Sequence, residues 1–322
     1  MGPAGAKGPG LVLLYDDLFL EHSSPGHPES PERLLAIRAR LTSEPALGRC
    51  RWQSAPSAIE EDVRLIHSGR HLARVQELSD AGGGWLDPDT YCGKRSFQVA
   101  LRALGVAMAA VEVATGEEPA PALALVRPPG HHATPEQAMG FCLFNNAAVA
   151  VRHAQRRLGI GRVAVVDLDV HHGNGTQDAF YQDGRVLYCS LHQLPLYPGT
   201  GLASEHGTGA GLGANLNVPL PHGSGPRAWL AALRQQVLPA LHRHRPELIL
   251  VSAGFDALAG DPLAQLELDP EAYAAAAELL IEAAAELGAA PTVWLLEGGY
   301  HLERMPEAVR RCALLLDQAA RA

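Results

Sequence analysis

The chain has 322 residues and a formal net charge of −9, with 47% hydrophobic and 19% charged residues. This composition is typical of a globular protein with a sizeable core, and its acidic balance argues against a nucleic-acid-binding protein, which normally presents a basic face. No run reaches the roughly 18 apolar residues that a membrane-spanning helix needs, so we expect no contact with a membrane. The five cysteines are odd in number and show no paired spacing, which indicates reduced thiols in a cytoplasmic protein, without a disulfide framework.

We expect residues 1–10, which are rich in Gly, Pro and Ala, to be disordered, and residues 11–322 to form one domain. Short apolar runs predict strands at 11–15, 123–126, 163–169, 186–191, 216–218, 248–252 and 292–296. Longer segments rich in Ala and Leu predict helices at 31–41, 96–114, 145–158, 226–244, 270–287 and 302–320. Alternation of this kind is typical of an α/β fold in which helices cover both faces of a parallel sheet.

Residues able to bind a metal or move protons follow five of these strands. They lie at 127–132, 167–174, 189–192, 252–256 and 297–300. Because ligands of parallel α/β sheets bind beyond the carboxyl ends of the strands, we expect these segments to meet at one edge of the sheet. The sequence therefore predicts an active site there.

A metal site is indicated by the segment after the strand at 163–166. Asp167, Asp169 and His171 alternate in an extended segment, so their side chains point one way. Buried charges need a positive partner, and a divalent metal is the simplest one, although an Asp–His hydrogen-bond network is the alternative. Asp256 can complete an open site with Asp169 and His171, unless it is a helix N-cap. This set of two aspartates and one histidine is more oxygen-rich than most zinc sites, so Fe(II) or Co(II) could compete with Zn(II).

Proton transfer is the expected task of His131 and His132, which follow a Pro-Pro-Gly turn. Imidazoles titrate near neutrality and suit general base and general acid roles, although a His pair can also be structural. Asp167 and Asn174 are the available orienting partners. Tyr300, preceded by two glycines, can donate its hydroxyl to an oxyanion opposite the metal.

Several motifs together resemble the signature set of the metal-dependent histone deacetylases. They are Arg-Pro-Pro-Gly-His-His-Ala (127–133), Gly-Phe-Cys-Leu-Phe-Asn-Asn (140–146), Asp-Leu-Asp-Val-His-His-Gly-Asn-Gly-Thr-Gln (167–177), Tyr-Pro-Gly-Thr-Gly (197–201), Ser-Ala-Gly-Phe-Asp-Ala (252–257) and Glu-Gly-Gly-Tyr (297–300). His-Pro-Glu-Ser-Pro-Glu-Arg-Leu (27–34) fits the N-terminal part of the same pattern. Many members carry Asp at the position of Asn174. Asn at this position resembles the class II and bacterial branch of the family, which includes acetylpolyamine amidohydrolases.

The resemblance implies an arginase/deacetylase fold with a central parallel sheet of about eight strands. Zinc would be held by Asp169, His171 and Asp256, while Tyr300 would polarise the acyl carbonyl. The protons would be handled by His131, backed by Asp167, and by His132, backed by Asn174. Because Asn174 is neutral, we expect the pKa of His132 to be lower than in relatives that carry Asp there.

The resemblance also implies sites for substrate and for ions. The substrate-binding residues would be Gly140, Phe141, Tyr197, Leu263 and, at the rim, Asp89, with Arg33 beside an acetate exit channel. A monovalent cation, expected to be potassium, would be bound by Asp167, Asp169, His171, Ser190 and Leu191. A second cation would be bound by Phe180, Asp183 and Val186.

The expected activity is removal of acetyl or other acyl groups from the lysine ε-amine of proteins or peptides. An acetylpolyamine amidohydrolase, or another small-molecule N-acyl amidohydrolase of this fold, is the alternative, but the apolar Leu263 and the lack of a long insertion favour acyl-lysine.

Two further interpretations are an arginase-like enzyme with two manganese ions and a binding protein without activity. The two-manganese enzyme would need another carboxylate at the position of Gly173. The presence of Tyr300 argues against a binding protein without activity. The sequence indicates no particular oligomeric state.

Overall fold

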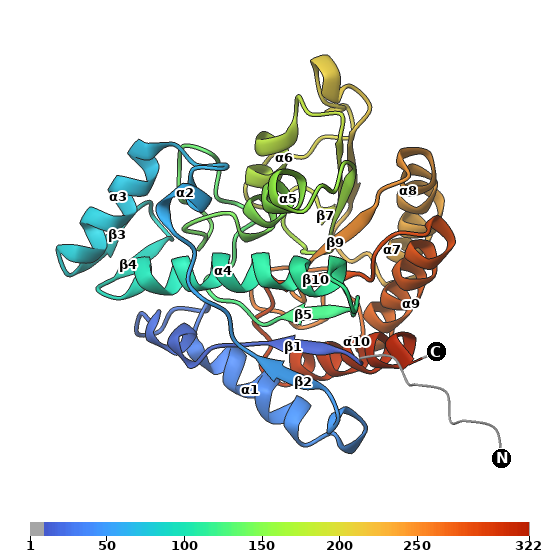
Figure 1. Ribbon diagram of the computed structural model, residues 1–322, viewed down its shortest axis with the longest axis horizontal. Helices are drawn as coiled ribbons and strands as arrows, with labels where there is room; N and C mark the ends of the chain where they lie inside the picture. The colour runs from blue at the N-terminus through green and yellow to red at the C-terminus, as the bar shows by residue number, and fades with distance from the viewer. Residues whose placement is uncertain (1–9, 322) are drawn as a thin grey trace.

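A parallel sheet of eight strands forms the centre of the protein in the computed structural model, which describes residues 10–321 (Figure 1). Residues 1–9, most of the segment expected to be disordered, lie outside the described residues. The strand order is β2-β1-β5-β10-β9-β6-β7-β8. The strands are β1 (Val12–Leu14), β2 (Arg51–Gln53), β5 (Ala122–Ala124), β6 (Val163–Asp167), β7 (Val186–Gln193), β8 (Asn215–Leu220), β9 (Leu248–Ala253) and β10 (Val293–Leu296). Every pair in this sheet is parallel, which confirms the predicted α/β architecture.

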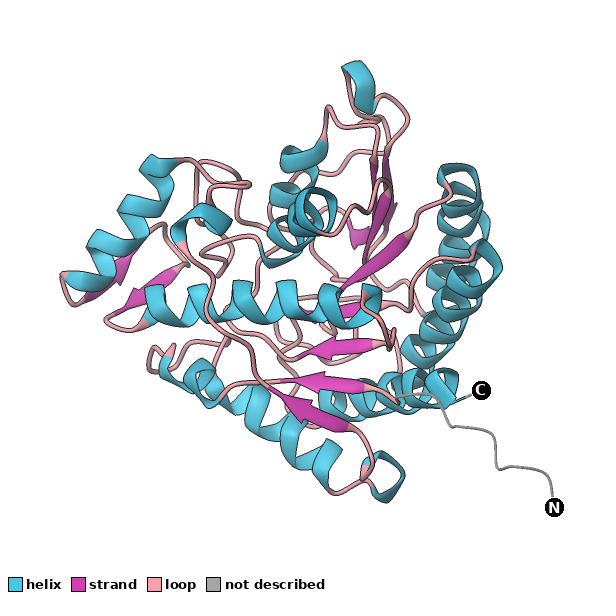
Figure 2. Cartoon of the chain, viewed as in Figure 1, coloured by secondary structure: helices cyan, strands magenta, loops and turns pink. Residues whose placement is uncertain are grey.

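Helices cover the sheet on both sides (Figure 2). They are α1 (Pro31–Thr42), α2 (Glu60–Val63), α3 (Gly69–Asp80), α4 (Ser96–Thr115), α5 (Asn146–Arg157), α6 (Asn174–Phe180), α7 (Pro226–Ala232), α8 (Leu238–His244), α9 (Pro270–Leu287) and α10 (Arg304–Arg321). Short 3₁₀ turns lie at Asp17–Glu21, Pro45–Leu47 and Gly209–Gly211, and a π-helical stretch at Leu233–Val237 joins α7 to α8. Helix α4 packs against α5, whereas α10 packs against both α1 and α9.

All six predicted helices and all seven predicted strands are present, with ends that differ by up to two residues. The strand at 163–169 is shorter than predicted, because β6 ends at Asp167 and the next residues turn away from the sheet. Six elements were not predicted. They are β2, α2, α3, α6 and the antiparallel pair of β3 (Gly83–Trp85) and β4 (Tyr91–Gly93).

The core explains why these segments form their elements. Val163, Val165 and Val166 of β6 are fully buried, which suits a β-branched strand covered on both faces. Helix α4 is long and apolar enough to span a membrane by composition, but two-thirds of it is buried within this fold, against α5 and β5. Helix α9 begins at Pro270 behind Asp269, whose carboxylate caps the helix by accepting a hydrogen bond from the Ala272 amide at 2.8 Å.

The sheet order brings the five chemistry-bearing strand ends together. Strands β5, β10, β9, β6 and β7 are consecutive neighbours in the sheet and all parallel, so their carboxyl ends share one edge. At the centre of this edge Asp167 is paired with Ser190 of β7 on one side and Ser252 of β9 on the other. The predicted gathering of these segments is confirmed.

Candidate active site

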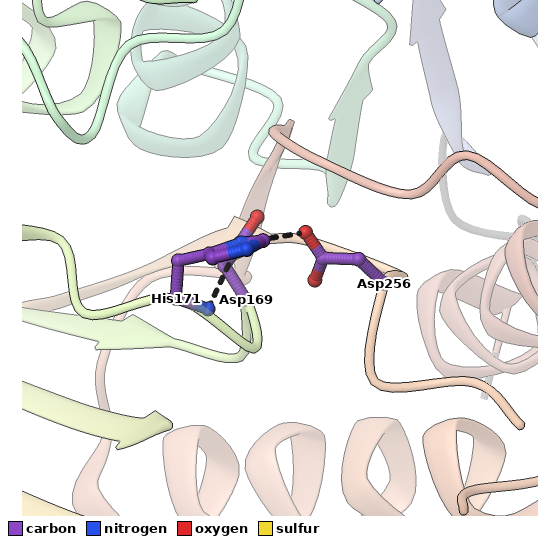
Figure 3. Close-up of side chains that lie close together, drawn as sticks. All are labelled: Asp169, His171 and Asp256. Carbon is purple, nitrogen blue, oxygen red and sulfur yellow. Dashed lines mark hydrogen bonds and ion pairs between the residues drawn. The ribbon is translucent and has the colours of Figure 1, made fainter. Parts of the chain in front are cut away.

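Three side chains at this edge form a buried cluster able to hold one metal ion. One ligand atom each from Asp169, His171 and Asp256 lies within 4.8 Å of the other two (Figure 3). His171 Nδ1 is 3.0 Å from Asp169 Oδ1 and 3.2 Å from Asp256 Oδ2. Asp169 and His171 lie on the loop after β6, and Asp256 lies on the loop after β9. Asp256 is therefore not a helix N-cap.

Backbone amides fix the two carboxylates in place. Asp256 Oδ1 accepts a hydrogen bond from the Val170 amide at 2.8 Å, and Asp169 Oδ2 accepts one from the Gly298 amide at 2.9 Å. A β-carbon on Gly298 would lie 2.2 Å from Asp256 Oδ2, so the backbone can approach the carboxylates only because this residue is glycine. The backbone thus holds both carboxylates, and the His171 amide adds a second hydrogen bond, to Asp169 Oδ1 at 2.9 Å; contacts of this kind orient the ligands in metal sites.

The electrostatics of the cluster favour a bound cation. Burial and the neighbouring Asp169 raise the pKa of the Asp256 carboxyl to about 7. Burial disfavours charge on His171, but hydrogen bonds to Asp169 and Asp256 raise the pKa of this imidazole to about 10. A divalent ion would satisfy the same three groups better than a proton, because it neutralises both carboxylates. The residues present therefore fit a zinc ion or another divalent metal.

The tandem histidines have different partners. His131 Nδ1 lies 3.0 Å from Asp167 Oδ2, and His132 Nδ1 lies 2.8 Å from Asn174 Oδ1, the partners that the sequence predicts. Although burial disfavours the imidazolium, Asp169 and Asp167 raise the pKa of His131 well above its ordinary value. Burial and the adjacent His131 hold the pKa of His132 well below its ordinary value. These opposite shifts favour the charged form of His131 and the neutral form of His132.

Two further residues support His131 and were not predicted to do so. Glu297 Oε2 accepts hydrogen bonds from the amides of Gly130 and His131, at 2.6 and 3.2 Å. The Tyr188 hydroxyl donates to Asp167 Oδ2 at 3.0 Å, on the oxygen that also faces His131. Glu297 was recognised only as part of a motif, and Tyr188 looks in the sequence like any apolar residue of a buried strand.

Tyr300 reaches the site from the loop after β10. Its ring packs edge-on against Phe141, and the guanidinium carbon of the buried Arg33 lies 4.9 Å from the ring centroid. Burial raises the pKa of Tyr300 well above its ordinary value, against the opposing effect of Arg33, so the hydroxyl is protonated and can donate. Arg33 lies behind Tyr300, where it donates to the Gly299 carbonyl oxygen at 2.7 Å. Its role at an acetate channel stays a prediction.

A cavity of about 190 Å³ opens above these groups. All five predicted substrate-binding residues line it, together with the two histidines of the pair, His171 and Tyr300; the five are Asp89, Gly140, Phe141, Tyr197 and Leu263. Tyr197 packs edge-on against His132 with ring centroids 5.1 Å apart. A β-carbon on Gly140 would lie 2.4 Å from His132 Cδ2, so only glycine allows this wall to close on the histidine.

The residues predicted to bind monovalent cations lie on adjacent segments. Asp167 and Ser190 are paired in the sheet, with Leu191 next along β7. Phe180, Asp183 and Val186 form a turn in which the Asp183 amide donates to the Phe180 carbonyl and the Val186 amide donates to the Asp183 carbonyl. Arg152 stacks on Phe180 and its guanidinium donates to Asp183 at 2.6 Å, so a fixed positive charge already lies beside this turn. Both cation sites stay predictions.

The cysteines are all free, as predicted, and four of the five are buried. Cys142 lies beside the cavity with its thiol 3.3 Å from the Gly140 carbonyl oxygen. Burial and the nearby Glu297 raise the pKa of this thiol well above its ordinary value, which favours the thiol over the reactive thiolate.

Comparisons with known proteins show the family of the chain. A family model described as "Histone deacetylase domain" matches residues 27–316. A "Histone deacetylase-like amidohydrolase" of Pseudomonas aeruginosa is 44% identical over 94% of this chain and 80% of its own length. A "Probable deacetylase" of Methanothermobacter thermautotrophicus is 42% identical over 94% of this chain and 88% of its own length.

The fold is likewise that of a solved deacetylase domain. The crystal structure of the HDA15 HD domain superimposes with a TM-score of 0.92 and 36% identity, covering 96% of this chain and 88% of that one. The predicted arginase/deacetylase fold is confirmed. The chain belongs to the histone deacetylase family.

Proposed function

We propose that this protein is a zinc-dependent hydrolase that removes acetyl or other acyl groups from the lysine ε-amine of proteins or peptides. The observation that carries the proposal is the convergence, at the foot of one cavity, of a three-residue metal cluster, a histidine pair and a tyrosine hydroxyl. The family supports a deacetylase or amidohydrolase, and metal dependence is general in it. The narrower assignments to zinc and to acyl-lysine are ours.

The residues divide the chemistry among them. A zinc ion held by Asp169, His171 and Asp256 would supply Lewis acidity to the acyl carbonyl and to a water molecule. Asn174 accepts from Nδ1–H of His132, which leaves Nε2 of this neutral ring free to take a proton from the attacking water. The same nitrogen then returns the proton to the amine as the C–N bond breaks. His131, held as imidazolium by Asp167, stabilises negative charge beside it.

Tyr300 acts on the other side of the carbonyl. Its protonated hydroxyl donates a hydrogen bond to the carbonyl oxygen, and this bond strengthens as negative charge develops there. The aromatic side chains of Phe141 and Tyr197, which line the cavity, suit the methylene chain of an acylated lysine.

The first test measures acetate release from an acetyl-lysine peptide by the zinc-loaded protein and by Tyr300→Phe. Loss of an oxyanion donor lowers kcat by about 10² to 10³-fold, and we expect a loss of this size. Tyr181→Phe is the matched control, because this tyrosine does not line the cavity, and it should retain full activity. Equal activity of Tyr300→Phe and wild type would remove the role assigned to Tyr300. A wild-type protein that releases no acetate with zinc, iron or cobalt would contradict the proposal.

Substrate class is tested by kcat/KM across acetyl-lysine peptides, longer acyl-lysines and N-acetylated polyamines. Leu263 is apolar and lines the cavity, so the wall carries no charge at this position to select a cationic amine. We therefore expect acyl-lysine peptides to be the better substrates. A higher kcat/KM for an acetylpolyamine would assign the protein to the alternative class.

A further inference from the structure

One buried carboxylate beside the cavity has no part in the chemistry proposed above. Asp261 lies in the loop between β9 and α9, is 6% exposed, and forms no ion pair among the described residues. It is also not a member of the metal cluster. A buried carboxylate without a cation is held only by the hydrogen bonds that it accepts, so those bonds indicate its role.

Asp261 connects two walls of the cavity. Its Oδ1 accepts a hydrogen bond from the Leu263 amide at 2.9 Å, and its Oδ2 accepts one from the Tyr300 amide at 2.8 Å. Leu263 and Tyr300 both line the cavity but come from different loops. Each oxygen of the carboxylate thus fixes the backbone of one of these two residues.

The backbone at Tyr300 needs such a contact. Strand β10 ends at Leu296 and α10 begins at Arg304, so Tyr300 lies in a loop without regular structure. The preceding Gly299 has φ of 118°, a backbone conformation that glycine adopts readily and other residues rarely adopt. Arg33 holds this segment from behind, through the Gly299 carbonyl and the tyrosine ring. Asp261 holds the same segment through its hydrogen bond from the Tyr300 amide, and it links this segment to the loop that contains Leu263.

We propose that Asp261 is a positioning residue, which fixes the Tyr300 hydroxyl in its place above the metal cluster and joins it to the Leu263 wall. The proposal rests on the proposed function, in which this hydroxyl donates to the acyl oxygen. Misplacing a catalytic group by about 1 Å can cost about 10²-fold in rate. Loss of the Asp261 carboxylate therefore lowers activity through Tyr300, although Asp261 touches neither substrate nor metal.

The tether itself is tested by hydrogen exchange in the metal-free protein, which requires no activity. Asp261→Ala removes the acceptor of two amides, so we expect exchange in peptides that contain Leu263 and Tyr300 to become at least about tenfold faster. The matched control is Asp269→Ala, which also removes an aspartate that accepts from a backbone amide, but at the start of α9. It should speed exchange near Ala272 and leave Tyr300 unchanged.

The effect on Tyr300 is tested by a double-mutant cycle on the zinc-loaded protein with an acetyl-lysine peptide. We expect Asp261→Ala to lower kcat by about 10- to 100-fold while KM changes by less than about threefold. In the Tyr300→Phe background the same substitution should lower kcat by less than about twofold. Asp261→Asn keeps one acceptor oxygen and should fall between wild type and Asp261→Ala, which also keeps the test open if Asp261→Ala folds poorly.

Three results would overturn the proposal. They are an equal loss of kcat in both backgrounds, a loss of bound zinc in the Asp261 variants, and unchanged exchange at Tyr300. A wild-type protein without deacetylase activity would instead contradict the proposed function, and the exchange measurement would then decide the tether by itself.

Discussion

At the scale of single residues, the tandem histidines show how a neighbour sets the chemistry of a side chain. His131 faces the carboxylate of Asp167, whereas His132 faces the amide of Asn174. A carboxylate stabilises an imidazolium by charge, and an amide oxygen only by a hydrogen bond. The sequence predicted both pairings, whereas the expectation that the pKa of His132 is lower than in relatives with Asp at this position stays a prediction, because burial and His131 are the main causes of its low value here. The sequence did not predict Tyr188 or Glu297 beside His131, because their roles depend on which strands become neighbours in the sheet.

The Asn174→Asp variant tests this account of His132. A carboxylate in this position should raise the pKa of His132, because its charge stabilises the imidazolium form. The proposed base acts when neutral, and it becomes neutral as the pH rises through its pKa. The acid limb of the kcat/KM profile should therefore move to higher pH. Asn145→Asp also replaces a buried asparagine, at the N-cap of α5, and should leave that limb in place. An unmoved acid limb in Asn174→Asp would exclude His132 as the group that titrates.

At the scale of elements, helix α4 carries a glycine that packing requires. Helix propensity alone predicts that Gly105→Ala stabilises the helix by about 1 kcal/mol. A β-carbon at Gly105 would, however, lie only 1.9 Å from the Pro56 carbonyl oxygen, which belongs to the backbone. We therefore expect this variant to lower the free energy of unfolding by about 1–3 kcal/mol, as measured by denaturant titration.

Gly69→Ala provides the matched comparison for Gly105→Ala. Gly69 is the first residue of α3, and its β-carbon would meet the half-exposed guanidinium of Arg64, which can move. This variant should have unchanged or slightly increased stability. A stabilising effect of Gly105→Ala would show that α4 can shift away from Pro56.

The elements that were predicted differ physically from those that were not. Strands such as β6 and β9 are continuous apolar runs in the core, and their pattern identifies them. Strands β2 and β3 have three residues each and include exposed tryptophans, Trp52 and Trp85, so no apolar run marks them. Helix α6 begins at Asn174, inside the motif that was assigned to chemistry. Patterns of apolar residues in the sequence therefore identify helices and strands that bury a large surface. They miss short strands that form by pairing with a neighbouring strand, and helices that lie within the segments of the site.

At the scale of the whole molecule, the order of strands in the sheet brings motifs that are far apart in the sequence together in one site. Five predicted strands are consecutive in the sheet, and this adjacency places 127–132, 167–174, 189–192, 252–256 and 297–300 along one edge. The rule for ligands at parallel sheets was sufficient to predict that these segments meet, and the residue types within them then indicated the metal cluster and the histidine pair. Asp261 escaped prediction because its Gly-Asp-Pro context indicates only a turn, and its contact with Tyr300 spans 39 residues.

The same architecture argues against a second metal ion at the proposed site. A β-carbon at Gly173 would lie 2.2 Å from Asp167 Oδ2, so no side chain at this position can supply the carboxylate that a second ion needs. We expect one zinc per chain. An ion that binds only the folded state stabilises it by about 4 kcal/mol at a free concentration 1,000 times its Kd, so zinc should raise the Tm and chelation should reverse the rise.

Two variants separate this effect from non-specific zinc binding. Asp256→Asn keeps an oxygen for the Val170 amide but removes a ligand charge, so the zinc-dependent rise in Tm should be lost. Without zinc this variant should be at least as stable as wild type, because it relieves repulsion between Asp256 and Asp169. Asp269→Asn keeps the cap of α9 and should respond to zinc as wild type does. Two tightly bound ions per chain, or a full response in Asp256→Asn, would contradict a single site, whereas loss of the response in Asp256→Asn alone would show that the buried cluster binds the ion.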